Sequence, residues 1–168
     1  MPASDFVMGL RAKIGNDLLQ VPTVSILIFD EDDRVLLVRH VEGNVWSTVG
    51  GMIEPLETPT DAAIREAFEE TGLVVQLDRI VGVFGGEEYL TVYSNGDRMS
   101  WVSTVFEASI KGGDLRPDQE ETLELRYFSL DELQDVDCVR HVVPFVEVAL
   151  RRDREAYIQP PRQGTDAD

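Results

Sequence analysis

Two kinds of apolar spacing alternate along the chain, and together they predict a mixture of strands and helices. Continuous apolar runs and period-two alternation are typical of strands, whereas apolar residues three or four positions apart are typical of a helix packed along one side. The run from 24 to 29 is apolar throughout, as in a strand buried on both faces. On this basis we expect strands at 24–29, 35–38, 46–49, 73–84, 91–93, 101–108 and 122–128.

Turn-forming residues indicate how some of these strands are connected. The acidic stretch 30–33 is expected to turn the first strand into the second as a hairpin. Asn95-Gly96 is a strong hairpin signal between the strands at 91–93 and 101–108. The segment 111–113 reads Lys-Gly-Gly and predicts a loop.

Helices are expected at both ends of the chain and at two places between. The N-terminal helix, within residues 5–20, follows from an apolar stripe of Phe6, Leu10, Ile14 and Leu18. Residues 58–72 predict a second helix, and Ser129 with Glu132 predicts the capped start of a short third one. Residues 141–157 are expected to form the closing helix.

The order of these elements predicts an α/β fold in which a mixed β-sheet lies between helices, an α/β/α sandwich. With 168 residues the chain is long enough for one domain with a substantial core. We expect an N-terminal helical extension at 1–20, the main domain at 21–157, and a flexible C-terminal tail at 158–168.

The second helix has clear ends and a concentration of acidic residues. Thr58 can cap its first turn, Pro59 suits its first position, Asp61 stands where a capping acid stands, and Gly72 suits a left-handed end. A period of 3.6 residues places three acids on one face, which we expect to point outward. The opposite side is expected to pack on the core. The acids are Glu66, Glu69 and Glu70, and the opposite residues are Ile64, Ala67, Phe68 and Thr71.

The acids are an electrostatic cost that a bound cation would relieve. Glu66 and Glu70 are like charges four residues apart, and the last turn lies at the negative end of the helix dipole. Arg65 can pair with Glu69 but cannot neutralise three carboxylates. Hard oxygen ligands suit Mg²⁺, Mn²⁺ or Ca²⁺. The alternative is a solvated acidic helix face.

The spacing of these residues resembles the Nudix box, GX5EX7REUXEEXGU. Gly51 is followed after five residues by Glu57 and after seven more by Arg65-Glu66, and then by Glu69-Glu70, Gly72 and Leu73. The charged and glycine positions of the motif are all present. Three positions depart from the usual pattern, since Ala67 replaces a bulkier aliphatic residue, and Leu56 and Val49 stand where Gly and Pro are common.

The resemblance implies a metal-dependent pyrophosphohydrolase on the Nudix fold. It assigns the metal, Mg²⁺ or alternatively Mn²⁺, to the box glutamates Glu66, Glu69 and Glu70, with the Gly50 carbonyl and a downstream acid as further ligands. That acid is expected to be Glu121, with Glu120 next. Glu57 and Arg65 would orient the ligands, and Glu66 or Glu69 would accept the proton of the attacking water.

The resemblance also implies a small-molecule nucleotide substrate: a nucleoside triphosphate, a nucleotide sugar such as ADP-ribose, or a dinucleoside polyphosphate. Arg39 and His40 are expected phosphate contacts, and Glu120 and Tyr89 are further candidates for substrate binding. Each has a plainer alternative: an exposed loop end for Glu120 and Glu121, a surface role for His40, and a core position for Tyr89. A catalytically silent Nudix-fold binding or regulatory module is the rival function.

The net charge and the cysteine content limit which binding partners and which cellular compartment we expect. A net charge of −17 disfavours nucleic acid and anionic membranes, and no apolar run is long enough to span a bilayer. Cys138 is the lone cysteine, which fits a reducing cytoplasm, and the N-terminus lacks the pattern of a secretory signal. Because Cys138 is far from the box, it is not the cysteine expected of an isoprenoid diphosphate isomerase on the same fold. A homodimer is a common assembly among proteins with this box.

Overall fold

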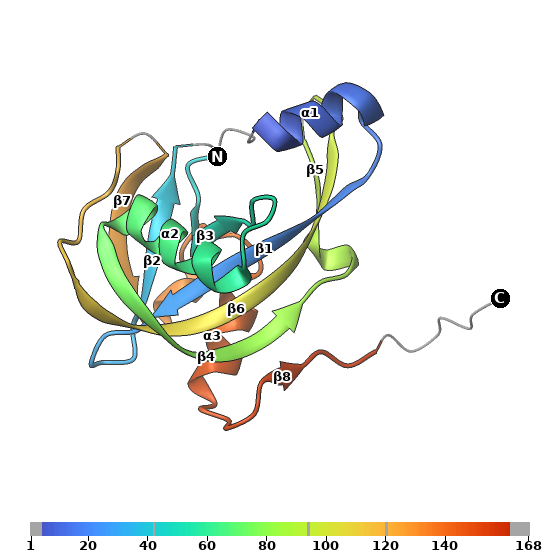
Figure 1. Ribbon diagram of the computed structural model, residues 1–168. Helices are drawn as coiled ribbons and strands as arrows, with labels where there is room; N and C mark the ends of the chain where they lie inside the picture. The colour runs from blue at the N-terminus through green and yellow to red at the C-terminus, as the bar shows by residue number, and fades with distance from the viewer. Residues whose placement is uncertain (1–4, 42, 94, 120, 162–168) are drawn as a thin grey trace.

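A mixed eight-stranded sheet runs through the centre of the molecule, as the computed structural model shows for residues 5–41, 43–93, 95–119 and 121–161 (Figure 1). The strand order is β7-β2-β3-β1-β6-β4-β8, with β5 paired to β6. The pairs β1–β6 and β4–β8 are parallel and the other pairs are antiparallel. The strands are β1 (Leu19–Ile28), β2 (Val35–His40), β3 (Trp46–Met52), β4 (Leu73–Phe84), β5 (Leu90–Val92), β6 (Arg98–Gly113), β7 (Thr122–Phe128) and β8 (Tyr157–Ile158).

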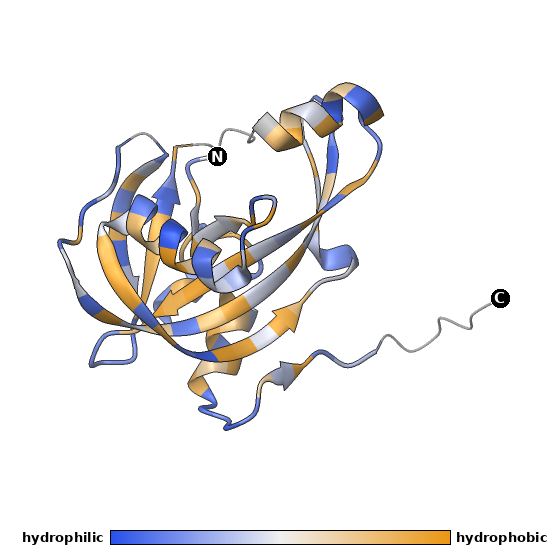
Figure 2. Ribbon diagram, in the orientation of Figure 1, coloured by the Kyte–Doolittle hydropathy of each residue, from blue (hydrophilic) through white to orange (hydrophobic). Residues whose placement is uncertain are grey.

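Helices cover both faces of this sheet and give it two apolar cores. α2 (Pro59–Thr71) packs on one face and α3 (Val142–Leu150) on the other (Figure 1). Along β1, Ile26 and Ile28 lie in the core under α2, whereas Leu27 lies in the core under α3. In Figure 2 much of the central sheet is orange, the apolar colour, whereas many of the loops around it are blue. The α/β/α sandwich and the doubly buried first strand are therefore confirmed.

The remaining helical segments are short. α1 (Asp5–Ile14) lies over one end of the sheet, where Val7 is buried with Val21, Met52 and Met99. Two 3-10 turns, η1 (Glu87–Tyr89) and η2 (Glu132–Gln134), complete the secondary structure. Among the residues that the structure describes, no helix is long and apolar enough to cross a membrane.

Two predicted connections are wrong because long-range pairing replaces them. The chain does turn at 30–33, where the Asp30 amide donates to the Arg34 carbonyl at 3.0 Å next to the antiparallel bridge Phe29–Val35. Beyond this turn β1 and β2 do not pair as a hairpin, since β3 lies between them. The segment 111–113 is the end of β6 and not a loop, because Gly112 and Gly113 pair with the start of β4. The hairpin at Asn95-Gly96 is confirmed, with β5 antiparallel to β6.

The helices near both ends of the chain are shorter than predicted. The N-terminal helix ends at Ile14, before Gly15 at φ 59°, because the following residues enter β1 and pair with β6. Leu18 therefore lies outside the helix, and both Leu18 and Phe6 of the predicted apolar stripe are about half exposed. The closing helix ends at Leu150, near Arg152 in the left-handed region at φ 55°.

The C-terminal segment adds a strand where none was expected. Tyr157 and Ile158 pair with β4, so residue 158, predicted to begin the tail, is part of the sheet. Residues 162–168 of that predicted tail lie outside the described residues. The Ser129–Glu132 capping pair forms reciprocal hydrogen bonds of 2.8 and 3.3 Å, but it starts only the single 3-10 turn η2.

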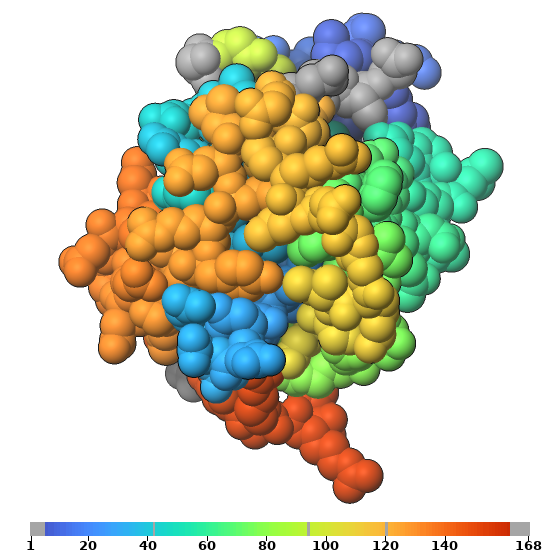
Figure 3. All heavy atoms as spheres, turned by 90° about the vertical axis from the view of Figure 1, so that its left-hand side faces the viewer, coloured from blue at the N-terminus to red at the C-terminus, as the bar shows by residue number. Residues whose placement is uncertain are grey.

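The segment between β6 and β7 closes over the end of α2. Its Arg116 amide donates to the Thr71 carbonyl at 2.9 Å. From the β7 side of the molecule, the gold atoms of this segment lie against green atoms of α2 and β4 (Figure 3). This contact places the acidic loop that precedes β7 beside the carboxylates of α2.

Candidate active site

The ends of α2 are set by the capping residues that the sequence contains. The Thr58 hydroxyl accepts from the Asp61 amide at 3.2 Å, Pro59 occupies the first helical position, and Gly72 ends the helix at φ 72°. The Gly72 amide donates to the Phe68 carbonyl at 2.8 Å. A Cβ at Gly72 would lie 2.5 Å from the Asp114 carbonyl oxygen, so a side chain there would collide with backbone. The predicted start and stop of the helix are confirmed.

The orientation of α2 on the sheet differs in part from the prediction, since Ala67 and Thr71 are buried as expected but the other positions are not. Glu66 is 6% exposed and Glu70 2% exposed, whereas Ile64 and Phe68 are 45% and 52% exposed. Of the three acids predicted to point outward together, only Glu69 does so. Three buried alanines, Ala62, Ala63 and Ala67, form the contact with the core under α2. Because alanine leaves the helix close to the sheet, the longer side chains of Glu66 and Glu70 lie between the two.

One carboxylate oxygen of Glu70 accepts a hydrogen bond, whereas the other has no hydrogen-bond donor among the described residues. Its Oε2 accepts from the Gly50 amide at 2.8 Å. Its Oε1 is buried with no hydrogen-bond donor among the described residues, although His40 Nε2 lies 3.8 Å away. Burial raises the pKa of Glu70 well above its ordinary value against the effect of the Gly50 amide, and the charges of Glu66, Glu121 and Asp118 raise it further. An additional positive group at Oε1 would stabilise the ionised carboxylate.

Gly50 can lie this close to β1 only because it has no side chain. Its φ is 142°, and a Cβ there would lie 2.2 Å from the Val24 carbonyl oxygen across the β1–β3 pair. This part of β3 therefore depends on glycine at position 50.

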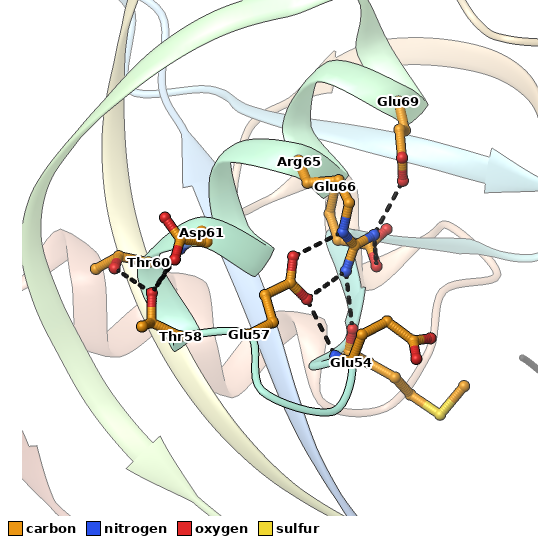
Figure 4. Close-up of polar contacts among 9 residues, drawn as sticks. Glu54, Glu57, Thr58, Thr60, Asp61, Arg65, Glu66 and Glu69 are labelled. Atoms are coloured by element: carbon orange, nitrogen blue, oxygen red, sulfur yellow. Dashed lines mark hydrogen bonds and ion pairs between the residues drawn. The ribbon is translucent and has the colours of Figure 1, made fainter. Parts of the chain in front are cut away.

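Arg65 is the centre of a network in which all five of its N–H groups donate (Figure 4). Nε and Nη2 hold the Glu57 carboxylate at 2.8 and 2.9 Å, and Nη2 also donates to the Met52 carbonyl at 3.1 Å. Nη1 donates to Glu66 Oε1 at 2.8 Å and to Glu69 Oε2 at 2.9 Å. Hydrogen bonding to Arg65 lowers the pKa of Glu57 despite its partial burial.

One guanidinium still leaves the site with excess negative charge. Burial raises the pKa of Glu66 against the attraction of Arg65, and the charges of Glu69 and Glu121 add to that effect. In the part of the chain that the structure describes, no three Asp, Glu, His or Cys side chains converge as a ready-made metal centre. The donor set nevertheless fits a hard divalent cation, because it consists of carboxylate oxygens and includes the open, buried Oε1 of Glu70.

The other predicted site residues divide into those near the carboxylates and those away from them. His40 lies against Glu70, and the charge of Glu121 acts on both Glu66 and Glu70. The Glu121 carbonyl accepts from the Val41 amide at 2.8 Å, which ties this loop to the end of β2. Arg39 Nη1 lies 3.3 Å from Glu124 Oε2 across the β2–β7 pair. Glu120 lies outside the described residues.

Tyr89 is on the other side of the sheet from the acids. It is buried in the core under α3, where its ring stacks with those of Phe145 and His141 at centroid distances of 6.2 and 6.3 Å. The structure does not bring it to the carboxylates of α2. Its plainer interpretation, a core position, matches this burial.

Asp118 belongs to the site although the sequence analysis did not select it. Its Oδ1 accepts from the amides of Glu121 and Thr122 at 3.0 and 2.9 Å, which shapes the loop before β7, and its charge acts on Glu70. An aspartate two residues before an acidic pair is the local sign of such a loop.

This combination of a capped helix, a strand that ends in glycines and buried glutamates occurs in a chain that matches a known family. The model of the NUDIX domain matches residues 19–146. The chain belongs to the NUDIX family. Among its relatives, a MutT-like protein of Streptomyces ambofaciens is 32% identical over 113 residues, which cover 67% of this chain and 66% of the relative. A putative 8-oxo-dGTP diphosphatase of Bacillus subtilis (strain 168) is 29% identical over 104 residues, covering 62% of this chain and 63% of the relative.

Solved structures share the fold of this NUDIX chain. A NUDIX hydrolase from Nitrosomonas europaea superposes with a TM-score of 0.65 at 22% identity, covering 85% of this chain and 98% of that one. This likeness concerns the fold. The curated relatives above are matched over slightly less than two thirds of their own length.

Proposed function

We propose that this NUDIX chain is a divalent-metal-dependent pyrophosphohydrolase that cleaves a nucleoside diphosphate linked to another moiety. The observation that carries the proposal is the pair of buried carboxylates, Glu66 and Glu70, with Glu70 Oε1 open. Burying unneutralised carboxylates is costly, and a fold retains such groups chiefly where a cation or a catalytic step uses them.

The metal we propose is Mg²⁺, with Mn²⁺ as the alternative. Its ligands would be drawn from Glu66, Glu69, Glu70, Glu121 and the Gly50 carbonyl. When bound, such an ion neutralises pyrophosphate charge and lowers the pKa of a bound water. Glu70 Oε1 is the acceptor that most needs a cation, because the described protein atoms supply it with no hydrogen bond.

Residues of the chain would position the carboxylates and accept the proton of the attacking water. Arg65 holds Glu66 and Glu69 through one nitrogen, and Glu57 holds Arg65 from the opposite side. Either Glu66 or Glu69 would accept the proton of the attacking water. Glu69 is exposed and can turn toward substrate, whereas Glu66 is held in place by burial. Arg39 and His40, at the end of β2, would contact substrate phosphates.

The substrates we propose are nucleotides: a nucleoside triphosphate, a nucleotide sugar such as ADP-ribose, or a dinucleoside polyphosphate. The putative 8-oxo-dGTP diphosphatase relative supports this class. An acidic protein with a net charge of −17 needs bound cations to attract such polyanions. We place the enzyme in the cytoplasm, where the lone Cys138 would stay reduced, and a homodimer is an assembly to test by light scattering.

A screen of these nucleotides with Mg²⁺, Mn²⁺ and EDTA tests the proposal. Phosphate released after coupling to a phosphatase reports hydrolysis. We expect turnover with metal, none with EDTA, and its loss in Glu69→Gln and Glu70→Gln. Nucleotide binding without turnover of any substrate would instead support a silent NUDIX-fold binding module. Wild-type turnover in both variants would refute the assignment of the site.

A further inference from the structure

A recess opens at the C-terminal end of α2, beside the carboxylate site. It has a volume of about 310 Å³, at the small end of the range for ligand pockets. α2 contributes one wall and the segment after β6 the other, the contact visible as gold against green in Figure 3. Its lining residues are Phe68, Glu69, Gly72, Arg116, Pro117 and Asp118.

Two lining residues connect this recess to the carboxylates. Glu69 also accepts from Arg65 Nη1 at 2.9 Å, and Asp118 shapes the loop that carries Glu121 through its hydrogen bonds to the Glu121 and Thr122 amides. A ligand group in the recess would therefore lie next to a pyrophosphate held at the glutamates.

Phe68 presents an open aromatic surface on this wall. Its side chain is 52% exposed although it is a phenylalanine on a helix that packs on the core. Other aromatic residues of the described chain contact one another, such as Phe84, which stacks with Tyr157 at a centroid distance of 5.5 Å, but Phe68 has no such ring contact among the described residues. A planar ring could stack on it without displacing protein.

Arg116 lines the recess from the segment after β6, and its backbone is hydrogen-bonded to α2. Its amide donates to the Thr71 carbonyl at 2.9 Å, and its side chain passes Gly72, where a Cβ would lie 3.0 Å from Arg116 Cγ. Among the described residues, no carboxylate lies within ion-pair distance of its guanidinium, which is unusual beside so many acids. A guanidinium plane is a good stacking partner for an aromatic ring.

We propose that Phe68 and Arg116 bind the nucleobase of the substrate and so determine its specificity. This inference rests on the proposed function and deepens it. The mixed charge of the recess favours a base over a phosphate, because Glu69 and Asp118 repel an anion but accept hydrogen bonds from ring N–H and amino groups. Stacking on Phe68 is tolerant of base identity, whereas the two carboxylates favour bases that carry such donors.

The test compares Phe68→Ala with Ile64→Ala. Ile64 is 45% exposed on the same face of α2, one turn earlier, and does not line the recess. For the best nucleotide of the screen, we expect Phe68→Ala to raise KM by roughly tenfold with kcat largely retained, since base–aromatic stacking is of that size. Phe68→Tyr should restore KM, and Arg116→Gln should raise it. Equal KM values for Phe68→Ala and Ile64→Ala would overturn the inference.

A binding measurement separates this inference from the proposed hydrolysis. Calorimetric titration with a nucleoside monophosphate and with ribose 5-phosphate requires no turnover. We expect Phe68→Ala to weaken the binding of the nucleoside monophosphate and to leave the affinity for ribose 5-phosphate unchanged. If wild-type protein hydrolyses no nucleotide but shows this pattern, the hydrolase proposal fails and the base site stands. If Phe68→Ala weakens the binding of both ligands equally, or of neither, the base site is refuted even in an active enzyme.

Discussion

The Gly50 amide donates to Glu70 Oε2 at 2.8 Å, joining strand β3 to the last turn of α2. The backbone conformation and the close packing at position 50 require glycine. Glu70 is an acid that is almost fully buried. The contact holds Glu70 so that its second oxygen points to the place where we expect the cation. Both partners can be tested separately.

Replacing Glu70 with glutamine should separate activity from stability. We expect Glu70→Gln to lower turnover by at least about a hundredfold, because a proposed metal ligand becomes a poor one. In EDTA its free energy of unfolding should equal or exceed that of wild type, since the amide need not bury a charge. Thermal unfolding with and without Mg²⁺ measures this, and Mg²⁺ should stabilise wild type more than the variant. Equal stabilisation of both proteins by Mg²⁺ would argue against Glu70 as a ligand.

Gly50→Ala should destabilise the fold as well as the site. The new Cβ would lie 2.2 Å from the Val24 carbonyl oxygen, and the φ of 142° disfavours any side chain. We expect a loss of about 2–4 kcal/mol in urea unfolding. Gly112→Ala is the matched control, because a Cβ there meets nothing within 4 Å. The control should be neutral or stabilising by about 0.5–1 kcal/mol. Similar losses in both would contradict the steric argument.

Leu56→Gly should stabilise the protein or leave it unchanged, which is rare for removal of an apolar side chain. Leu56 is fully exposed in the turn before α2 and has a φ of 71°, in the left-handed region. Relief of that strain should contribute about 1 kcal/mol, partly offset by the greater freedom of glycine in the unfolded chain. Leu115→Gly, at an exposed loop leucine without positive φ, should destabilise. Chemical denaturation of the two variants gives the comparison.

His141 should make stability depend on pH in mildly acidic solution. Burial lowers its pKa from 6.5 to about 4, and the charge of Arg140 adds to the shift. Between these values the unfolded chain binds the proton more readily, so this contribution is complete above pH 6.5 and is lost as the pH falls toward 4. The loss should be at most about 3 kcal/mol. Urea unfolding of wild type and His141→Gln at pH 7 and 4.5 should show the larger decrease in wild type, and identical decreases would contradict it.

The boundaries of α2 and the spacing of its acids could be read from the sequence because they depend on local chemistry. Thr58 caps the first turn and Gly72 takes the left-handed end within the same dozen or so residues, so both were correctly predicted. The Arg65–Glu69 pair, four residues apart on one helix, follows from helical geometry alone. Apolar runs located the strands for the same reason, and the family resemblance is confirmed by the match over residues 19–146.

Only the tertiary structure decided which side of α2 faces the sheet. Helical periodicity separates Glu66 and Glu70 from Ile64 and Phe68 but cannot rank the two faces, since hydrophobicity alone favours burial of the second. The small contact made by Ala62, Ala63 and Ala67, together with the Gly50 amide from a strand distant in sequence, selected the acidic side. The insertion of β3 between β1 and β2 was likewise decided by long-range pairing. Burial of acids is favourable only where the rest of the fold supplies partners, and those partners lie outside any local window of sequence.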